Sequence, residues 1–235
     1  MSAVPRKRVA VLISGRGSNM SALIGAAMDP SFPGEIVAVL SNKPDAGGLE
    51  TAARYGIPAK AVSHRDHETR ESHEAALIRM LDEFRPDIVC LAGYMRLLTR
   101  RFVEHYKGRM INIHPSLLPL FPGLHTHERA LQAGMRVHGC TVHFVTEDMD
   151  EGPIIAQAAI AIEPGDTPDR LSDRLLRAEH RLYPHALRLV LDGTVRMEDG
   201  KAVFAADGSA TAAPSTGHAG RDGFAIIVSP DGRDG

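Results

Sequence analysis

The chain has 235 residues, of which 43% are hydrophobic and 24% are charged, and its formal net charge is −2 at pH 7. A chain of this length and composition can bury a hydrophobic core as one large domain or two small ones. The near-neutral charge argues against a polyanionic partner, so nucleic-acid binding is not expected. No segment approaches the ~18 apolar residues that a membrane-spanning helix requires. The first apolar run, 9–13, is too short for the hydrophobic region of a signal peptide, so no signal peptide is expected.

The two cysteines, Cys90 and Cys140, both lie in apolar runs. Their separation fits neither a CxxC pair nor a zinc-binding pattern, so we expect two small buried side chains. Such cysteine usage is typical of a reducing, cytoplasmic location.

In the first half of the sequence, short apolar runs alternate with amphipathic stretches. The apolar runs predict strands at 9–13, 35–41, 60–63, 87–92 and 109–113. The stretches between them predict one helix with Ser18 as its N-cap and two more at 46–55 and 69–84. This alternation predicts an α/β, Rossmann-like fold with a mostly parallel central sheet and helices on both faces.

The second half has a different pattern. The alternating run 141–145 and the apolar run 153–162 predict an antiparallel C-terminal extension of the sheet. Thr167 and Pro168 predict the N-cap and first position of a long helix, and Pro184 within it should cause a kink or a break.

A glycine-rich loop, Ser14-Gly-Arg-Gly-Ser-Asn19, follows the first predicted strand and opens the first predicted helix. Backbone N–H groups at such a helix N-terminus can bind an anion. Met20 stands where the third glycine of a dinucleotide fingerprint would be, and the second strand ends in Ser41-Asn-Lys43 without an acidic residue. The loop is therefore interpreted as a cradle for one phosphate, with a plain strand-to-helix turn as the alternative.

Asn112 and His114 are two residues apart at the end of a predicted strand, so their side chains point to one side of the sheet. Open α/β sheets bind ligands at this edge, and an amide and an imidazole that face one cavity can stabilise an oxyanion. A structural histidine is the alternative. Asp150 lies in an acidic loop bounded by glycine and proline; a carboxylate beside His114 would favour the charged imidazolium, but such loop residues usually only face solvent.

Other catalytic patterns are missing from the sequence. His125 and His127 are two apart and do not have the spacing of an HExxH motif, so no metal site is predicted. Neither a GxSxG nucleophile motif nor a Walker A loop is present.

Residues from about 8 to 204 resemble the phosphoribosylglycinamide formyltransferases, a family of folate-dependent enzymes of purine biosynthesis. The resemblance is specific because several motifs occur together and in order. They are ISGRGSN at 13–19, LAGYMRLL at 91–98, NIHPSLLP at 112–119, FPGLHTH at 121–127, the segment 143–153, and EHRLYP at 179–184.

The resemblance implies roles for individual positions. The catalytic trio would be Asn112, His114 and Asp150. The ribonucleotide-binding positions would be Gly17, Ser18, Asn19 and Glu179. The folate-binding positions would be Arg70, Met95, Arg96, Leu97, Leu98, Asn112, Glu147, Asp148, Met149 and Asp150.

The implied reaction is direct attack of a substrate amine on a formyl group, with 10-formyltetrahydrofolate as the donor. Asn112 and His114 would stabilise the oxyanion, and Asp150 would keep His114 charged. Neither a metal nor a covalent intermediate is needed. The implied partners are small-molecule substrates, with no nucleic acid and no membrane, and the implied state is a monomer or a weak homodimer.

The resemblance also concerns the loop after the catalytic histidine. The Leu118–Pro119 peptide bond is expected to be cis, as in similar proteins. Leu120 departs from the family pattern, because some relatives carry a lysine there, so a phosphate or solvent contact is expected to be lost.

These observations divide the chain into a flexible N-terminus at 1–7, a formyltransferase domain at 8–206 and a tail at 207–235. Within the domain, 8–108 would form the phosphate-binding half and 109–206 the catalytic and folate-binding half. The tail is rich in Gly, Ala, Ser, Thr and Pro and is expected to be mostly disordered, although an apolar run, FAIIV, interrupts it.

Three other functions fit parts of the sequence. A formyltetrahydrofolate deformylase would use the same trio with water as the nucleophile, but similar proteins usually carry an additional N-terminal domain. A methionyl-tRNA formyltransferase would need a C-terminal RNA-binding domain and more basic charge. A non-catalytic nucleotide-binding module would use only the glycine loop, and a tail that recruits partners is compatible with catalysis.

Overall fold

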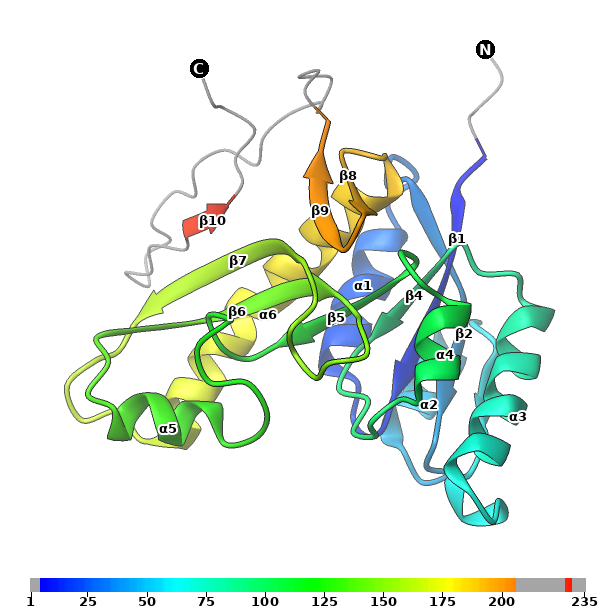
Figure 1. Cartoon of the computed structure of the whole chain (residues 1–235), viewed down its shortest axis with the longest axis horizontal. Helices are drawn as coiled ribbons and strands as arrows, with labels where there is room; N and C mark the ends of the chain where they lie inside the picture. The colour runs from blue at the N-terminus through cyan, green and yellow to red at the C-terminus, as the bar shows by residue number, and fades with distance from the viewer. Residues whose placement is uncertain (1–4, 206–226, 230–235) are drawn as a thin grey trace. The chain divides into compact units, whose positions relative to one another are not determined.

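The computed structural model describes residues 5–205 and 227–229 (Figure 1). The chain forms two compact units, the first from 1–112 and 145–147, the second from 113–144 and 148–235. Most of the N-terminal segment and of the tail for which flexibility or disorder is expected lies outside the described residues.

The first unit contains a parallel sheet. Its strands are β1 (Lys7–Ile13), β2 (Gly34–Ser41), β3 (Ala59–Ala61), β4 (Ile88–Leu91) and β5 (Met110–His114), and the last two residues of β5 belong to the second unit. They pair in parallel in the order β3-β2-β1-β4-β5, and the parallel pairing, though not the order, was predicted from the alternation of strands and helices.

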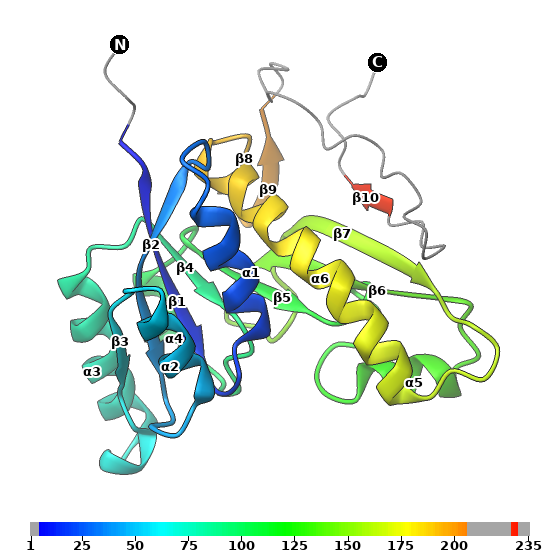
Figure 2. The same ribbon diagram turned by 180° about the vertical axis from the view of Figure 1, so that it is seen from behind.

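Helices cover both faces of this sheet. They are α1 (Ser18–Ala27), α2 (Gly47–Arg54), α3 (Arg70–Glu83) and α4 (Arg100–His105), with a short 3-10 turn, η1 (His64–Asp66), before α3. The ribbon views place α3 and α4 on one face and α1 on the other (Figures 1 and 2). This arrangement confirms the predicted α/β fold class.

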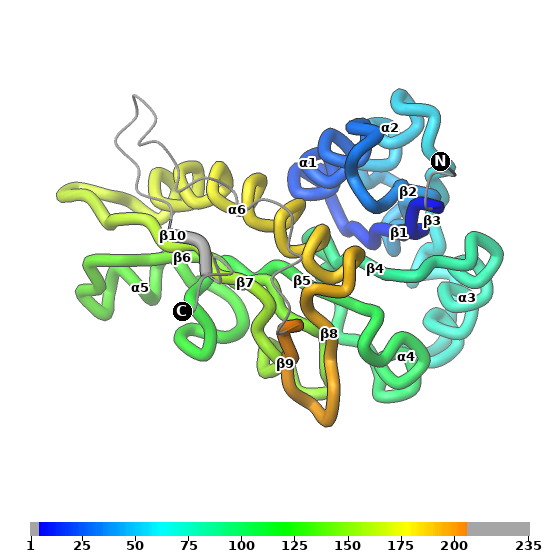
Figure 3. Tube along the Cα trace, turned by 90° about the horizontal axis from the view of Figure 1, so that it is seen from above, coloured from blue at the N-terminus to red at the C-terminus, as the bar shows by residue number. Residues whose placement is uncertain are grey.

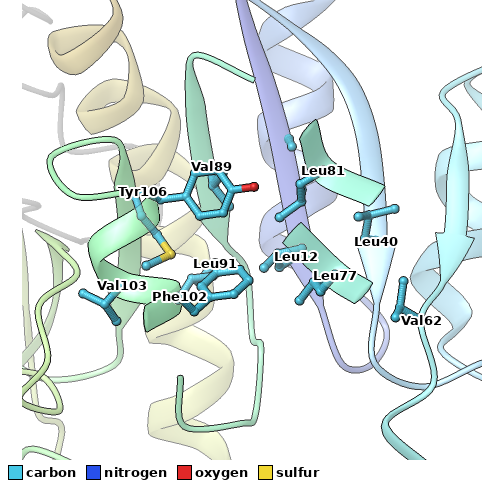
Figure 4. Close-up of a cluster of buried hydrophobic side chains, with 12 residues drawn as sticks. Leu12, Leu40, Val62, Leu77, Leu81, Val89, Leu91, Phe102, Val103 and Tyr106 are labelled. Atoms are coloured by element: carbon cyan, nitrogen blue, oxygen red, sulfur yellow. The ribbon is translucent and has the colours of Figure 1, made fainter. Parts of the chain in front are cut away.

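The core on the α3–α4 face joins four strands, β1, β2, β4 and β5, to two helices (Figure 4). Leu12 of β1 and Leu40 of β2 belong to the same cluster as Leu77 and Leu81 of α3 and Phe102 of α4. Full burial of each large apolar side chain stabilises the fold by about 1.5–3 kcal/mol. Burial on both faces also explains why these strands read as continuous apolar runs.

Two helices differ from what the sequence predicted. The N-cap of α1 is Gly17, with a φ of 70°, and Ser18 is the first helical residue. The left-handed region strongly favours glycine, so backbone conformation decided the cap position against the hydroxyl of Ser18. Helix α4, capped by Thr99, was not predicted, because six residues are too few to show helical periodicity.

The second unit contains antiparallel strands and the longest described helix. Its elements are α5 (Thr126–Gln132), β6 (Val137–Phe144), β7 (Ile154–Ala161), α6 (Pro168–Leu191), β8 (Val195–Glu198), β9 (Lys201–Phe204) and β10 (Ile227–Ser229). Strand β7 pairs antiparallel with β6 on one side and β10 on the other, which confirms the predicted antiparallel extension. Helix α6 runs along the β6–β7 pair (Figure 3).

Helix α6 begins as predicted, with Thr167 as the N-cap and Pro168 at its first position. Of the predicted kink or break at Pro184, a break is wrong, because the helix continues to Leu191. Buried side chains such as Leu182 and Leu187 lie close to the proline on both sides, so packing outweighs the one lost backbone hydrogen bond. No helix in the described part of the chain has the length and apolar character needed to cross a membrane.

Candidate active site

His114 is the last residue of β5, and its side chain is 8% exposed. Its Nδ1 lies 3.4 Å from Oδ2 of Asp150, and its Nε2 lies 3.1 Å from the carbonyl oxygen of Phe121. A carbonyl oxygen and a carboxylate only accept hydrogen bonds, so each ring nitrogen of His114 faces an acceptor oxygen.

Asp150 is held in an uncommon backbone conformation, with a φ of 60°. Its side chain is 11% exposed, and Oδ2 accepts a hydrogen bond of 2.8 Å from the backbone N–H of Gly123. Aspartate tolerates the left-handed region better than most residues, and such outliers gather at functional sites. The backbone thus directs this carboxylate towards His114, a neighbour that only the family resemblance had implied.

The acidic loop reaches this position because Gly152 packs directly against β6. A Cβ atom built on Gly152 would lie 1.7 Å from the carbonyl oxygen of Phe144, so no other residue fits. The Phe144 N–H also donates a 2.9 Å hydrogen bond to the carbonyl of Pro153. These contacts fold the segment that carries Asp150 back onto the end of the strand.

His143 is a residue of this cluster that the sequence analysis did not identify as functional. Its Nε2 lies 3.9 Å from Oδ1 of Asp150, and its Nδ1 lies 2.9 Å from the carbonyl of Phe144. Burial lowers the pKa of His143, although the Phe144 carbonyl and the Asp150 charge oppose the effect. A neutral histidine thus lies beside Asp150. Its strand position alone could not reveal this, because the neighbour comes from a loop.

A second histidine pair, His127 and His138, lies in the same unit, with 2.9 Å between Nδ1 of the first and Nε2 of the second. Burial, and then the neighbouring His127, lowers the pKa of His138 to about 4. The pKa of His127 is lowered by burial and by His114. Within residues 5–205 and 227–229, no group of three or more potential metal-binding His, Cys, Asp or Glu side chains occurs.

The loop after His114 is fixed by hydrogen bonds from buried polar groups. The Leu118–Pro119 bond is cis, which confirms the expectation from the resemblance. Thr141 of β6 donates to the carbonyl of Ser116 at 2.7 Å, and the Ser116 hydroxyl donates to the carbonyl of Leu120 at 2.6 Å. The Leu120 side chain is exposed, so its backbone and not its side chain contributes to this structure.

The glycine loop lies in the first unit. Gly17 carries no side chain to cap α1, and the helix begins directly at Ser18 and Asn19. A Cβ atom on Gly48 would approach Ile13 to 2.5 Å, so the start of α2 packs closely on the end of β1. The first turn of α1 thus begins with backbone N–H groups that have no partner within the helix, as at any helix N-terminus.

The implied folate-binding residues are found in several places. Met95, Arg96, Leu97 and Leu98 follow β4, and Arg70 is the exposed first residue of α3. Met95 and Leu97 are 64% and 56% exposed, which is unusual for large apolar side chains.

The remaining implied residues have different surroundings. Glu147 forms an exposed ion pair of 3.0 Å with Arg100 in the first unit, and the side chains of Asp148 and Met149 are exposed. Glu179 is buried on α6. Asn112 lies on β5 opposite Leu91 of β4.

Comparison with known proteins identifies the same family along most of the chain. Residues 7–187 match the formyl transferase family. The chain is 45% identical over 194 residues to phosphoribosylglycinamide formyltransferase of Escherichia coli (strain K12), covering 83% of this chain and 92% of that protein. A crystal structure of phosphoribosylglycinamide formyltransferase from Brucella melitensis is 56% identical, with a TM-score of 0.78, and the match covers 86% of this chain and 100% of that one.

The chain also matches part of a much longer protein. It is 50% identical over 202 residues to the trifunctional purine biosynthetic protein adenosine-3 of Bos taurus. The match covers 85% of this chain but only 20% of that protein. The matches to the formyl transferase family and to near full-length relatives show that this chain belongs to the phosphoribosylglycinamide formyltransferase family.

Proposed function

We propose that this protein transfers the formyl group of 10-formyltetrahydrofolate to the amine of 5′-phosphoribosylglycinamide in purine biosynthesis. The observation that carries this proposal is the buried contact of His114 with Asp150 in a chain of this family. Asn112 stands two residues before His114 on β5, so strand alternation directs both side chains to one side.

In the proposed reaction, the amine nitrogen attacks the formyl carbon, and the carbonyl electrons move to the oxygen. The amide of Asn112 donates a hydrogen bond to the resulting oxyanion. The imidazolium of His114 stabilises the oxyanion by its positive charge, because both ring nitrogens already face Asp150 and the Phe121 carbonyl. When the oxyanion collapses, the bond to N10 of the folate breaks. N10 takes up one proton and the former amine releases one, so the protons balance, and Asp150 keeps His114 charged throughout.

The proposed binding sites use residues with suitable chemistry. Gly17, Ser18 and Asn19 at the start of α1 would hold the phosphate of the ribonucleotide, and Glu179 would contact the rest of that substrate. The folate would lie against the exposed apolar side chains of the 94–98 segment. The full set proposed for the folate is Arg70, Met95, Arg96, Leu97, Leu98, Asn112, Glu147, Asp148, Met149 and Asp150.

The first experiment separates amine transfer from hydrolysis. Purified protein is incubated with 10-formyl-dideazafolate, and loss of the formyl group is followed by absorbance with and without glycinamide ribonucleotide. Product that forms only with the ribonucleotide supports the transferase. Product at an equal rate without it would replace this proposal by the deformylase, and no product in either case would contradict catalysis.

The role of Asn112 has its own test. Asn112→Ala is expected to lower kcat by about 100-fold or more, because a donor to the oxyanion is typically worth that much. Gln132→Ala, which removes an exposed amide from α5, is the matched control and should keep the wild-type rate. A near wild-type rate for the Asn112 variant would refute its role.

A further inference from the structure

The segment 94–98 follows β4 and leads to the N-cap of α4, and two of its apolar side chains, Met95 and Leu97, are unusually exposed. Under the proposed function, this segment contacts the folate. An exposed segment loses conformational freedom when it binds a ligand, and affinity improves if the protein fixes its backbone beforehand. The residues that hold the two ends of the segment therefore influence how well the folate binds.

Ser14 holds the first end. Its hydroxyl accepts a hydrogen bond of 2.8 Å from the N–H of Met95 and donates one of 2.6 Å to the side chain of Asn42. Its own N–H donates to the carbonyl of Gly93 at 3.2 Å. Ser14 and Asn42 are both buried, so this end of the segment is fixed from within the core.

Glu74 of α3 holds the second end. Its Oε1 accepts a 2.9 Å hydrogen bond from the backbone N–H of Thr99, and its Oε2 accepts one from the Thr99 hydroxyl. Glu74 is only 3% exposed. A buried carboxylate is costly unless strong hydrogen bonds compensate for the lost water, so both contacts matter energetically.

The side-chain hydroxyl of Tyr94, the first residue of the segment, does not take part in this anchoring. Its hydroxyl is buried and has no hydrogen-bond partner within the described residues. Burial raises the pKa of Tyr94, and the negative charge of Glu74 raises it further, while Arg96 lowers it. The Glu74 carboxylate is therefore close enough to Tyr94 to influence its pKa, but its hydrogen bonds go to Thr99.

We propose that Glu74 is a positioning residue for folate binding, which fixes the C-terminal end of the 94–98 segment to helix α3. The same helix carries Arg70 at its start, one turn before Glu74. One carboxylate therefore links the two folate-side elements, the start of α3 and the 94–98 segment. Glu74 acts through Thr99 and touches neither substrate. This inference rests on the proposed function.

The test compares kinetic constants for the two substrates. In Glu74→Ala, KM for the folate donor should rise about tenfold or more, because two charge-assisted hydrogen bonds to one residue are lost. KM for the ribonucleotide and kcat should stay within about threefold of wild type. The binding constant for tetrahydrofolate, measured by isothermal titration calorimetry, should weaken in parallel without any turnover.

Matched variants separate positioning from a general loss of structure. Glu71→Ala removes an exposed carboxylate from the same helix and should match wild type. Thr99→Ser keeps both donors and should also match wild type, whereas Thr99→Val keeps only the N–H and should raise the folate KM by a smaller factor than Glu74→Ala. Glu74→Gln keeps the shape of the side chain and one acceptor oxygen, so its folate KM should lie between those of wild type and Glu74→Ala.

The outcomes are distinguishable. If the wild-type protein does not transfer the formyl group, the proposed function itself is refuted. An active wild type with an unchanged folate KM in Glu74→Ala would refute the positioning role, as would equal rises in KM for both substrates. If Glu74→Ala does not fold, Glu74→Gln and Thr99→Val decide in its place: an unchanged folate KM in both contradicts the proposal, and a selective rise supports it.

Discussion

At the scale of single residues, Asp150 has both a strained backbone and a buried carboxylate. It lies against His114 and accepts a hydrogen bond from the N–H of Gly123. Substitution by asparagine can remove the charge of this side chain and keep one acceptor oxygen, because asparagine tolerates the same backbone conformation. The fold and the chemistry can therefore be tested independently at this position.

Asp150→Asn is expected to lower kcat by roughly 100-fold to 10,000-fold, the usual range for a group that assists proton transfer. The reason is that a neutral amide no longer favours the imidazolium of His114. The melting temperature should change little, because the amide oxygen can still accept the hydrogen bond from Gly123. Kinetics and thermal unfolding check both parts, and an Asp150→Asn enzyme with full activity would contradict the role of the charge.

Gly152 is expected to be intolerant of any side chain. In Gly152→Ala, the new Cβ would overlap the carbonyl of Phe144, so the acidic loop must shift and stability should fall by about 1–3 kcal/mol. Gly25→Ala is the control, because that helical position has open space and alanine favours helix. Denaturant unfolding of both variants compares them, and equal stability would refute the argument from packing.

At the scale of elements, the edge of strand β7 is covered by a short strand from the C-terminal region. Residues 227–229 pair antiparallel with 157–159 of β7. The run from Ile154 to Ile162 contains no charged residue and no proline. An uncovered edge with such a sequence is a template for pairing with another chain.

Removal of the chain after Ala206 is therefore expected to expose the β7 edge. The amides of β7 that β10 covers should exchange with solvent at least about tenfold faster, and the protein should self-associate more strongly. Hydrogen exchange and light scattering measure these effects. Val228→Pro, which removes one backbone donor from β10, should act in the same direction, and Val228→Ala should not. Unchanged exchange at β7 after truncation would contradict this role of β10.

At the scale of the whole molecule, several buried or half-buried histidines have a lowered pKa and are neutral near pH 7. They are His73, His127, His138, His143, His180 and His185. In the unfolded chain, each would titrate near its ordinary value of about 6.5. As the pH falls below that value, the unfolded state takes up protons before the native state does, so the native state loses stability.

Stability should therefore decrease between pH 6.5 and about pH 4, where the native pKa of His138 lies. That residue alone would account for about 3.5 kcal/mol at most, at about 1.4 kcal/mol for each pKa unit. Urea unfolding at pH 7.5, 5.5 and 4.5 measures the slope. His138→Gln, which cannot take up this proton, should reduce the slope, and an identical slope in that variant would contradict the assignment.

The sequence predicted most of the elements but not every boundary. Apolar runs such as 9–13 and the helical spacing of Leu77 and Leu81 are local patterns, and they located the parallel sheet and its helices α1, α2 and α3 correctly. The hairpin β8–β9 was missed although Asp199 and Gly200 form its turn with φ values of 47° and 73°. Its strands of four residues are too short for a clear alternation.

By itself, the sequence determined the order of strands and helices, the glycine turn at Gly17 and the set of polar residues available for chemistry. These features depend on periodicity, backbone freedom and residue type, which act over a few neighbouring residues. Only the tertiary structure decided that Asp150 and the unanticipated His143 lie together and that Glu74 holds Thr99. Such contacts join residues distant in the chain, and they depend on the packing of loops, for which the sequence has no periodic signal.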